Sequence, residues 1–298
     1  MNYQLYPWLK DLESPEAQTA LDVARKTYLE TGTVTLPRFV TADALQTMVQ
    51  QARAAEDAAF TTDETHTAYL ADPDYNRFDK RSVYNHSMRT QVASIAFDEL
   101  PKDSPLASLY RDPILLQLAS RIVTGHANSL HLSADPLGCC SINVFRPNYH
   151  HSFHFDESVF STTLMLQEAS DPSTGLFQCT PPLRPDKKDL ALPDVAAAIQ
   201  AYDQETPIPE PFAEGPSLAT KEPPRLRTLD FQAGTLSFFS GSCSLHRVTR
   251  VKGTQSRLVA VLTYGTQPGF CNSAAVQKLF WGRSVQPNCE TTKLFGME

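Results

Sequence analysis

His154 and Asp156, two residues apart, are the residues of this sequence best suited to hold a metal ion. On an extended segment, residues two apart point to the same face, so the imidazole and the carboxylate can bind one ion. His246 is the strongest candidate for a third ligand, because it follows the apolar stretch 234–239 and the turn 240–243. Two histidines and one carboxylate on one side of a metal leave further positions open, which is the geometry of non-haem iron(II) oxygenases. The spacing therefore predicts an iron site.

Arg257 begins an apolar stretch shortly after His246. A guanidinium at that position would be buried, and a buried arginine needs a carboxylate partner in two-pronged geometry. The distal carboxylate of 2-oxoglutarate is the natural partner. We therefore expect iron(II), 2-oxoglutarate and dioxygen as the cofactor and co-substrates, with Arg257 binding the 2-oxo acid.

The elements that must position these residues change in type along the chain. The first third reads as helical, with helix starts at Ser14-Pro15, Thr41, Ser104-Pro105 and Asp112-Pro113 and a short strand near 32–37. From about residue 129, short segments rich in β-branched and aromatic residues predict strands at 141–145, 160–167, 176–180, 234–239 and 257–264. Helices followed by a β-rich half indicate an α+β fold.

The 298 residues are expected to form a single domain. Its helical N-terminal part covers about 1–128, with residues 61–90 polar and irregular. A jelly-roll core covers about 129–270 and contains a proline-rich, charged insertion at about 183–228 with one short helix near 194–202. The C-terminal segment is 271–298.

Composition narrows the classes of partner. The net charge of −7 argues against a nucleic-acid partner, which needs a clustered basic surface. The sequence contains no run of 18 or more apolar residues, the length needed to span a membrane, and its N-terminus lacks the pattern of a secretory signal. The six cysteines never form a CxxC pair, so we expect them to be reduced packing residues. These features favour a cytoplasmic protein with a small-molecule substrate.

Six stretches resemble one group within the 2-oxoglutarate oxygenases: DPLG at 135–138, SINVFR at 141–146, HFDE at 154–157, LHRVT at 245–249, RLVAVLTY at 257–264 and LFWGR at 279–283. The group comprises the lysine-type amino-acid halogenases and their hydroxylase relatives, which act on free amino acids. The resemblance covers most of residues 75–285. It implies a double-stranded β-helix (jelly-roll) core with helical N-terminal support.

The resemblance also implies a set of ligand-binding residues. Matching the motifs assigns the α-carboxylate and amine of an amino acid to Arg81, His151, Glu157, Thr263 and Trp281. Asn143 resembles a position that contacts 2-oxoglutarate in more distant members. The halogenases carry a small residue where this chain has Asp156, so the resemblance implies hydroxylation of an unactivated C–H bond, with release of succinate and carbon dioxide.

Three other readings of the same residues stay open at this stage. The iron site could support desaturation or cyclisation instead of hydroxylation. The chain could be a metal-binding jelly roll without oxygenase activity, or a zinc hydrolase, since two histidines and an acid also bind zinc. Arg257 argues against the last two, because neither needs a buried guanidinium beside the metal.

Overall fold

In the computed structural model, which describes residues 1–206, 208, 211–214 and 222–285, the predicted helix starts are confirmed. The side chains of Ser14, Thr41, Ser104 and Asp112 each accept a hydrogen bond from a backbone N–H in the first turn. Such caps satisfy donors that a helix leaves unpaired at its N-terminus. The helices are α1 (Pro15–Thr31), α2 (Ala42–Ala55), α3 (Pro105–Tyr110), α4 (Pro113–Thr124), α5 (Leu192–Tyr202) and α6 (Ala274–Trp281).

The strands form two main antiparallel sheets and one small pair. The larger sheet has the order β1-β10-β7-β12-β5-β3-β2, the smaller β6-β11-β8-β9, and β13 pairs with β4. Their bounds are β1 (Thr33–Leu36), β2 (Phe60–His66), β3 (Met88–Ile95), β4 (His131–Leu132), β5 (Cys140–Phe145), β6 (His151–His154), β7 (Ser161–Gln167), β8 (Phe177–Cys179), β9 (Arg227–Thr228), β10 (Leu236–Phe239), β11 (His246–Val248), β12 (Arg257–Leu262) and β13 (Tyr264–Gly265).

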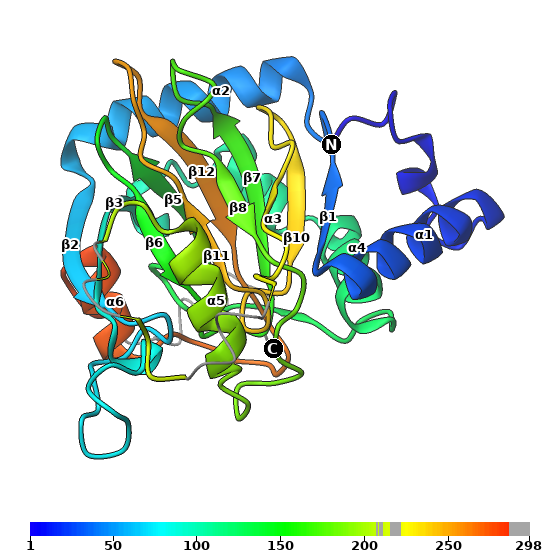
Figure 1. The fold of residues 1–298 in the computed structure, drawn as a ribbon. Coiled ribbons are helices and arrows are strands. Elements are labelled where there is room, and N and C mark those ends of the chain that lie inside the picture. Colours follow the sequence, from blue (N-terminus) through cyan, green and yellow to red (C-terminus); the bar gives the residue numbers. More distant parts are fainter. Residues whose placement is uncertain (207, 209–210, 215–221, 286–298) are drawn as a thin grey trace.

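An apolar core lies between the two main sheets. Phe145, Met165 and Val259 of the larger sheet pack in one cluster with Phe177 and Val248 of the smaller. The opposite face of the larger sheet is covered by α2, α3 and α4, which lie behind the strands in Figure 1, and α1 lies beside the edge strand β1. The inner faces of the two sheets therefore enclose the space in which β6, β11 and β12 place the predicted site residues.

The expectation that residues 61–90 are irregular is wrong for β2 and for the start of β3. These two strands pair with each other, and β3 pairs with β5, so the segment forms one edge of the larger sheet. Most side chains of β2 are exposed or half-buried, so its sequence, FTTDETH, carries no apolar run. Because β1 also joins this sheet, the part before residue 129 supplies strands as well as helices.

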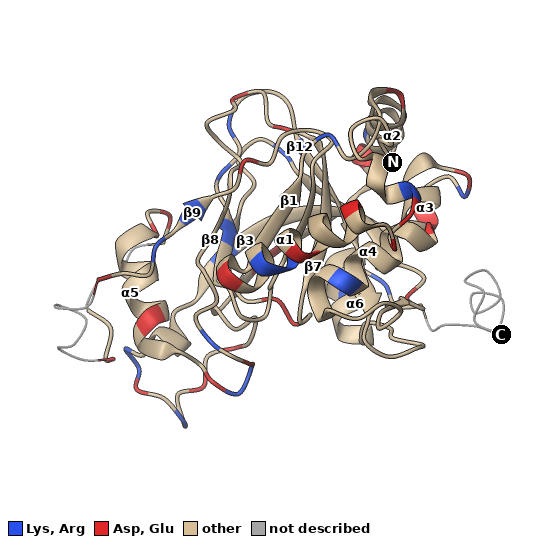
Figure 2. Cartoon of the chain, turned by 90° about the vertical axis from the view of Figure 1, so that its right-hand side faces the viewer, with Lys and Arg blue, Asp and Glu red and all other residues tan. Residues whose placement is uncertain are grey.

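The predicted helix near 194–202 is confirmed by α5, and β9 adds a short strand to the smaller sheet. Residues 207, 209–210 and 215–221 of the expected insertion, and 286–298 of the C-terminal segment, lie outside the described residues. Figure 2 shows acidic and basic residues interspersed along the helices and loops. Among the described residues, all five cysteines are free, and no helix has the length and apolar character needed to cross a membrane.

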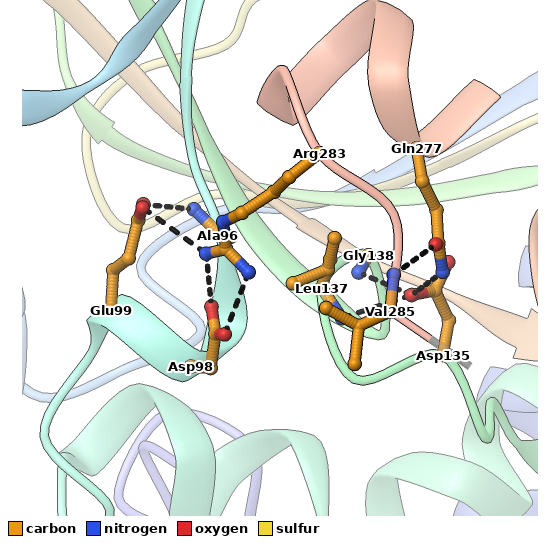
Figure 3. A network of polar contacts seen from close by, with 9 residues as sticks. All are labelled: Ala96, Asp98, Glu99, Asp135, Leu137, Gly138, Gln277, Arg283 and Val285. Carbon is orange, nitrogen blue, oxygen red and sulfur yellow. Dashed lines mark hydrogen bonds and ion pairs between the residues drawn. The ribbon is translucent and has the colours of Figure 1, made fainter. Parts of the chain in front are cut away.

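Helix α6 is attached to the rest of the fold by a buried carboxylate and a surface ion pair (Figure 3). Asp135 is fully buried and accepts hydrogen bonds from Gln277 of α6 and from the neighbouring Asn272. It also accepts from the backbone N–H groups of Leu137 and Gly138. Just after the helix, Arg283 forms an ion pair with Asp98 and Glu99. The contacts of Asp135 are those of a structural residue.

Candidate metal centre

The three predicted metal ligands come together at the edge of the smaller sheet. His154 ends β6, His246 begins β11, and the two residues are direct partners in the antiparallel pairing. Asp156 follows β6, and its Oδ1 lies 3.4 Å from His154 Nε2 and 3.3 Å from His246 Nε2. One potential ligand atom from each residue lies within 4.8 Å of the other two, so the cluster could hold one metal ion.

Backbone carbonyls fix the orientation of both imidazoles. The Nδ1 of His154 lies 2.8 Å from the carbonyl oxygen of Ser152, and the Nδ1 of His246 lies 2.9 Å from that of Ser244. A carbonyl can only accept, so each Nδ1 must carry the hydrogen and donate it. Each Nε2 therefore keeps its lone pair and directs it towards Asp156, which is the tautomer that a metal-binding histidine needs.

Ser161 and Gly241 hold Asp156 in place. The sequence did not predict either residue for the site. Ser161, the first residue of β7, donates a hydrogen bond to Asp156 Oδ2 at 2.5 Å. Gly241 accepts from the backbone N–H of Asp156 at 3.0 Å. A methyl group at Gly241 would meet Oδ2 and lie 2.8 Å from Asp156 Cγ. Only glycine leaves room for the carboxylate in this position.

The protonation states of the cluster suit a cation. Burial by itself would raise the pKa of Asp156, but the neighbouring His246 and His154 outweigh it and hold this pKa well below its usual range. Burial, together with His246, lowers the pKa of His154. At neutral pH the carboxylate is thus ionised and the imidazole of His154 is neutral, which are the forms that bind metals.

His151 lies directly against the metal cluster. Its ring stacks on the ring of His154, with centroids 3.7 Å apart and planes 16° from parallel. His66 meets both rings edge-on and hydrogen-bonds to Thr90 through Nε2 at 2.6 Å. Burial lowers the pKa of His66 to about 4, so this ring is neutral at neutral pH. The predicted ligand His154 is therefore backed by two further imidazoles.

Arg257 is buried without a hydrogen-bond partner for its Nε within the described residues, and only 2% of it is exposed. Its guanidinium lies over the rings of Phe145 and Phe231, at 5.3 and 5.9 Å from their centroids. Burial lowers its pKa to about 9, and Glu168 opposes that shift. A buried cation without an acceptor is costly, so this site fits an anion that binds there.

Asn143 shares the inner face of the larger sheet with Arg257. In the pairing of β12 with β5, Arg257 stands opposite Phe145 and Val259 stands opposite Asn143. Residues two apart on a strand lie on one face, and Phe145 and Val259 belong to the core between the sheets. The expected 2-oxoglutarate residues Arg257 and Asn143 thus lie on one face of neighbouring strands.

A pocket of about 670 Å³ reaches the cluster at Asp156, whereas His154 and His246 do not line it; the exposed Glu157 is also a lining residue. Of the residues that the resemblance assigns to the substrate, Glu157 alone lines it. Arg81 is exposed and faces Asp79, and Trp281 packs with Ala96 and Leu137. Thr263 accepts from the hydroxyl of Tyr110 through its carbonyl. Their substrate roles, and that of His151, stay predictions.

Arg184 lines the same pocket and escaped the sequence analysis. It lies in the segment interpreted as a proline-rich insertion, where no periodicity or motif distinguishes one arginine from another. In the structure it is 6% exposed, and its guanidinium lies over the ring of Phe155, the residue that separates the predicted ligands His154 and Asp156 in the sequence.

The fold is similar to those of two solved enzymes. One is SnoN, a non-heme, α-ketoglutarate-dependent epimerase from nogalamycin biosynthesis, with 13% identity, 83% of each chain covered and a TM-score of 0.52. The other is SnoK, a non-heme, α-ketoglutarate-dependent carbocyclase from the same biosynthesis, with 15% identity, 94% of this chain and 96% of that chain covered and a TM-score of 0.50. At these identities the likeness establishes a shared fold. No protein-family model matches the sequence, nor does any curated protein.

Proposed function

We propose that this chain is a non-haem iron(II), 2-oxoglutarate-dependent oxygenase that hydroxylates an unactivated C–H bond of a small organic substrate. The observation that carries the proposal is the cluster of His154, Asp156 and His246, with both Nε2 lone pairs and an ionised carboxylate directed at one another. Two histidines and one carboxylate are the ligand set of this class of iron enzyme. We infer that the two main sheets form the double-stranded β-helix expected from the sequence.

Arg257 supports 2-oxoglutarate as the co-substrate. Among the residues that the structure describes, its buried guanidinium has no acceptor for Nε, and it stands on the inner face of the larger sheet beside Asn143. A carboxylate would supply both the missing acceptor and the missing negative charge. The fold that the chain shares with SnoN and SnoK, each named as α-ketoglutarate-dependent, agrees with this assignment.

In this proposal the three ligands bind iron(II), and the metal supplies the oxidising chemistry when dioxygen and the 2-oxo acid are present. The chain supplies position. Ser152 and Ser244 hold the imidazoles, Ser161 holds the carboxylate, Gly241 leaves room for it, and Arg257 orients the 2-oxo acid. The pocket beside Asp156 then determines which carbon of the substrate faces the metal.

The substrate we propose is a free amino acid or a derivative, on the strength of the resemblance described above. Hydroxylation is favoured over halogenation because Asp156 occupies the position that a halide would need. Cyclisation or desaturation is the second candidate reaction, and the fold that this chain shares with the carbocyclase SnoK supports it. Product mass with chloride present separates these outcomes: a gain of one oxygen atom, a loss of two hydrogens, or a gain of chlorine.

The decisive experiment measures succinate formed from 2-oxoglutarate by the native protein with iron(II), with zinc(II) and with a chelator. We expect succinate to form with iron(II) but not with zinc(II) or the chelator. The correct substrate in a panel of free amino acids should increase the rate of succinate formation. His246→Ala is the matched negative control. If the native protein with iron(II) forms no more succinate than this variant, the chain is a metal-binding module or a hydrolase.

A further inference from the structure

The pocket beside Asp156 has in its wall a buried cation, Arg184, that forms no ion pair within the described residues. Arg184 donates from Nε to the carbonyl of Ser242 at 2.6 Å and from Nη1 to that of Asp189 at 3.4 Å. Both acceptors are uncharged, and Nη2 has no hydrogen bond within the described residues. Burial lowers the pKa of Arg184, and Tyr69, Cys243, Asp189 and Asp186 oppose this shift. A cation this deeply buried fits an anionic ligand.

Aromatic rings hold this guanidinium and form much of the pocket. The Cζ of Arg184 lies 3.9 Å from the centroid of the Phe155 ring and 5.8 Å from that of Tyr69. Tyr69 in turn stacks on Tyr84, with centroids 4.9 Å apart and planes 17° from parallel. The hydroxyl of Tyr69 donates to the carbonyl of Leu190 at 2.7 Å, which fixes its ring. Phe160, Tyr264 and Phe270 also line the pocket.

These features describe a ligand with two parts. A guanidinium fixed by stacking and by two carbonyls presents its remaining N–H groups in one plane, which matches the two oxygens of a carboxylate. Aromatic walls favour a flat or apolar body. Lys187 also lines the pocket and bonds to the carbonyl of Glu157, so a second positive charge lies near its opening.

We infer that the substrate of the proposed oxygenase is a carboxylic acid with an apolar or aromatic body, and that Arg184 binds its carboxylate. This inference rests on the proposed function. It gives Arg184 the role that the resemblance assigned to Arg81, whose side chain is exposed and faces Asp79. Because Arg184 and Asp156 line the same pocket, an acid bound to Arg184 can place its body beside Asp156.

The test compares acids with amides of the same shape. Isothermal titration calorimetry measures binding of 3-phenylpropionate against 3-phenylpropanamide, and of L-phenylalanine against L-phenylalaninamide. Saturating 2-oxoglutarate is present so that Arg257 is not the site that is measured. For native protein we expect each acid to bind about 10- to 100-fold more tightly than its amide, as a charge-assisted two-pronged contact predicts. Arg184→Gln should remove the preference, and Arg184→Lys should keep only part of it.

Arg81→Gln is the matched control and should retain the full preference for the acid. Cobalt(II) titration of each variant reports whether the metal cluster has survived the substitution. The inference is wrong if native protein binds none of the acids, if it binds acid and amide equally, or if the preference persists in Arg184→Gln. It is equally wrong if the preference is lost in Arg81→Gln. These binding measurements need no turnover, so a failure to form succinate would reject the oxygenase and leave the result on Arg184 readable.

Discussion

Two carboxylates of this molecule, Asp135 and Asp156, lie in opposite electrostatic surroundings. Asp135 receives five hydrogen bonds, all from N–H donors, and needs nothing more: Leu137 N, Gly138 N, Asn272 N, Asn272 Nδ2 and Gln277 Nε2. Asp156 receives one hydroxyl donor, from Ser161, and otherwise faces imidazole nitrogens that carry lone pairs. A carboxylate surrounded by donors is structural, whereas one surrounded by other lone pairs is arranged for a cation.

The largest expected effect separates the two carboxylates by activity. Asp156→Ala, like His154→Ala and His246→Ala, should abolish iron-dependent succinate formation and weaken iron binding, because one of three ligands is gone. Asp135→Asn should retain both succinate formation and iron binding, because the amide oxygen of asparagine can still accept hydrogen bonds from several of the same donors. Succinate assays and metal titrations check this. Wild-type turnover in all three ligand variants would mean that the metal site lies elsewhere.

For stability we expect the opposite order, with the larger loss from the change at Asp135. Asp135→Ala should lower the free energy of unfolding by about 3–5 kcal/mol, because several buried N–H groups lose their acceptor at once. Asp156→Ala should lower that of the metal-free protein by less than Asp135→Ala does, because Ser161 loses one bond and the lost attraction of His154 and His246 is offset by removal of a buried charge. Urea denaturation in the presence of a chelator measures both. Equal losses would remove the distinction between a structural and a metal-binding carboxylate.

Arg257 belongs with Asp156, because the described residues also supply no acceptor for its buried Nε. Arg257→Lys should weaken 2-oxoglutarate binding by about 2–5 kcal/mol, since an ammonium cannot replace a two-pronged contact. The measurement is 2-oxoglutarate affinity by calorimetry. Arg146→Lys is a suitable control, because Arg146 is already bonded to Thr61 and to the carbonyl of Glu56. An unchanged affinity in Arg257→Lys would exclude Arg257 from the co-substrate site.

Gly241→Ala tests whether the room left for Asp156 matters. The added methyl group must displace the carboxylate, so cobalt(II) affinity should fall about 10- to 100-fold, as for other supports of metal ligands. The control is the same change in an Asp156→Gly background, where no carboxylate is present to displace. A loss of equal size in both backgrounds would point to the backbone of the 240–243 turn instead.

The smallest effect concerns the surface ion pair near Asp135. Arg283→Gln removes the contacts with Asp98 and Glu99, which are partly exposed, so the free energy of unfolding should fall by about 0–1 kcal/mol. Denaturation at low and at high salt checks this, because salt screens such a pair and should shrink the difference. A loss as large as that of Asp135→Ala would show that α6 depends equally on both contacts.

Local chemistry made much of this molecule predictable from its sequence. Ser14, Thr41 and Asp112 begin helices because each side chain caps its own first turn, which needs no information from elsewhere in the chain. The strands of the β-rich half follow from runs of β-branched and aromatic residues. His154 and Asp156 could be paired for the same reason, since two residues of one extended segment share a face.

The sequence by itself thus determined the capped helices, most central strands and the types and spacing of the predicted metal ligands. Only the tertiary structure decided which distant groups complete the site. Gly241 and Ser161 support Asp156, and Arg184 lies over Phe155, through contacts between segments that no local pattern links. Edge strand β2 escaped prediction because it buries little and needs no apolar pattern. The spacing of apolar residues indicates which face of a segment is buried. A functional site depends in addition on which buried faces of distant segments come into contact.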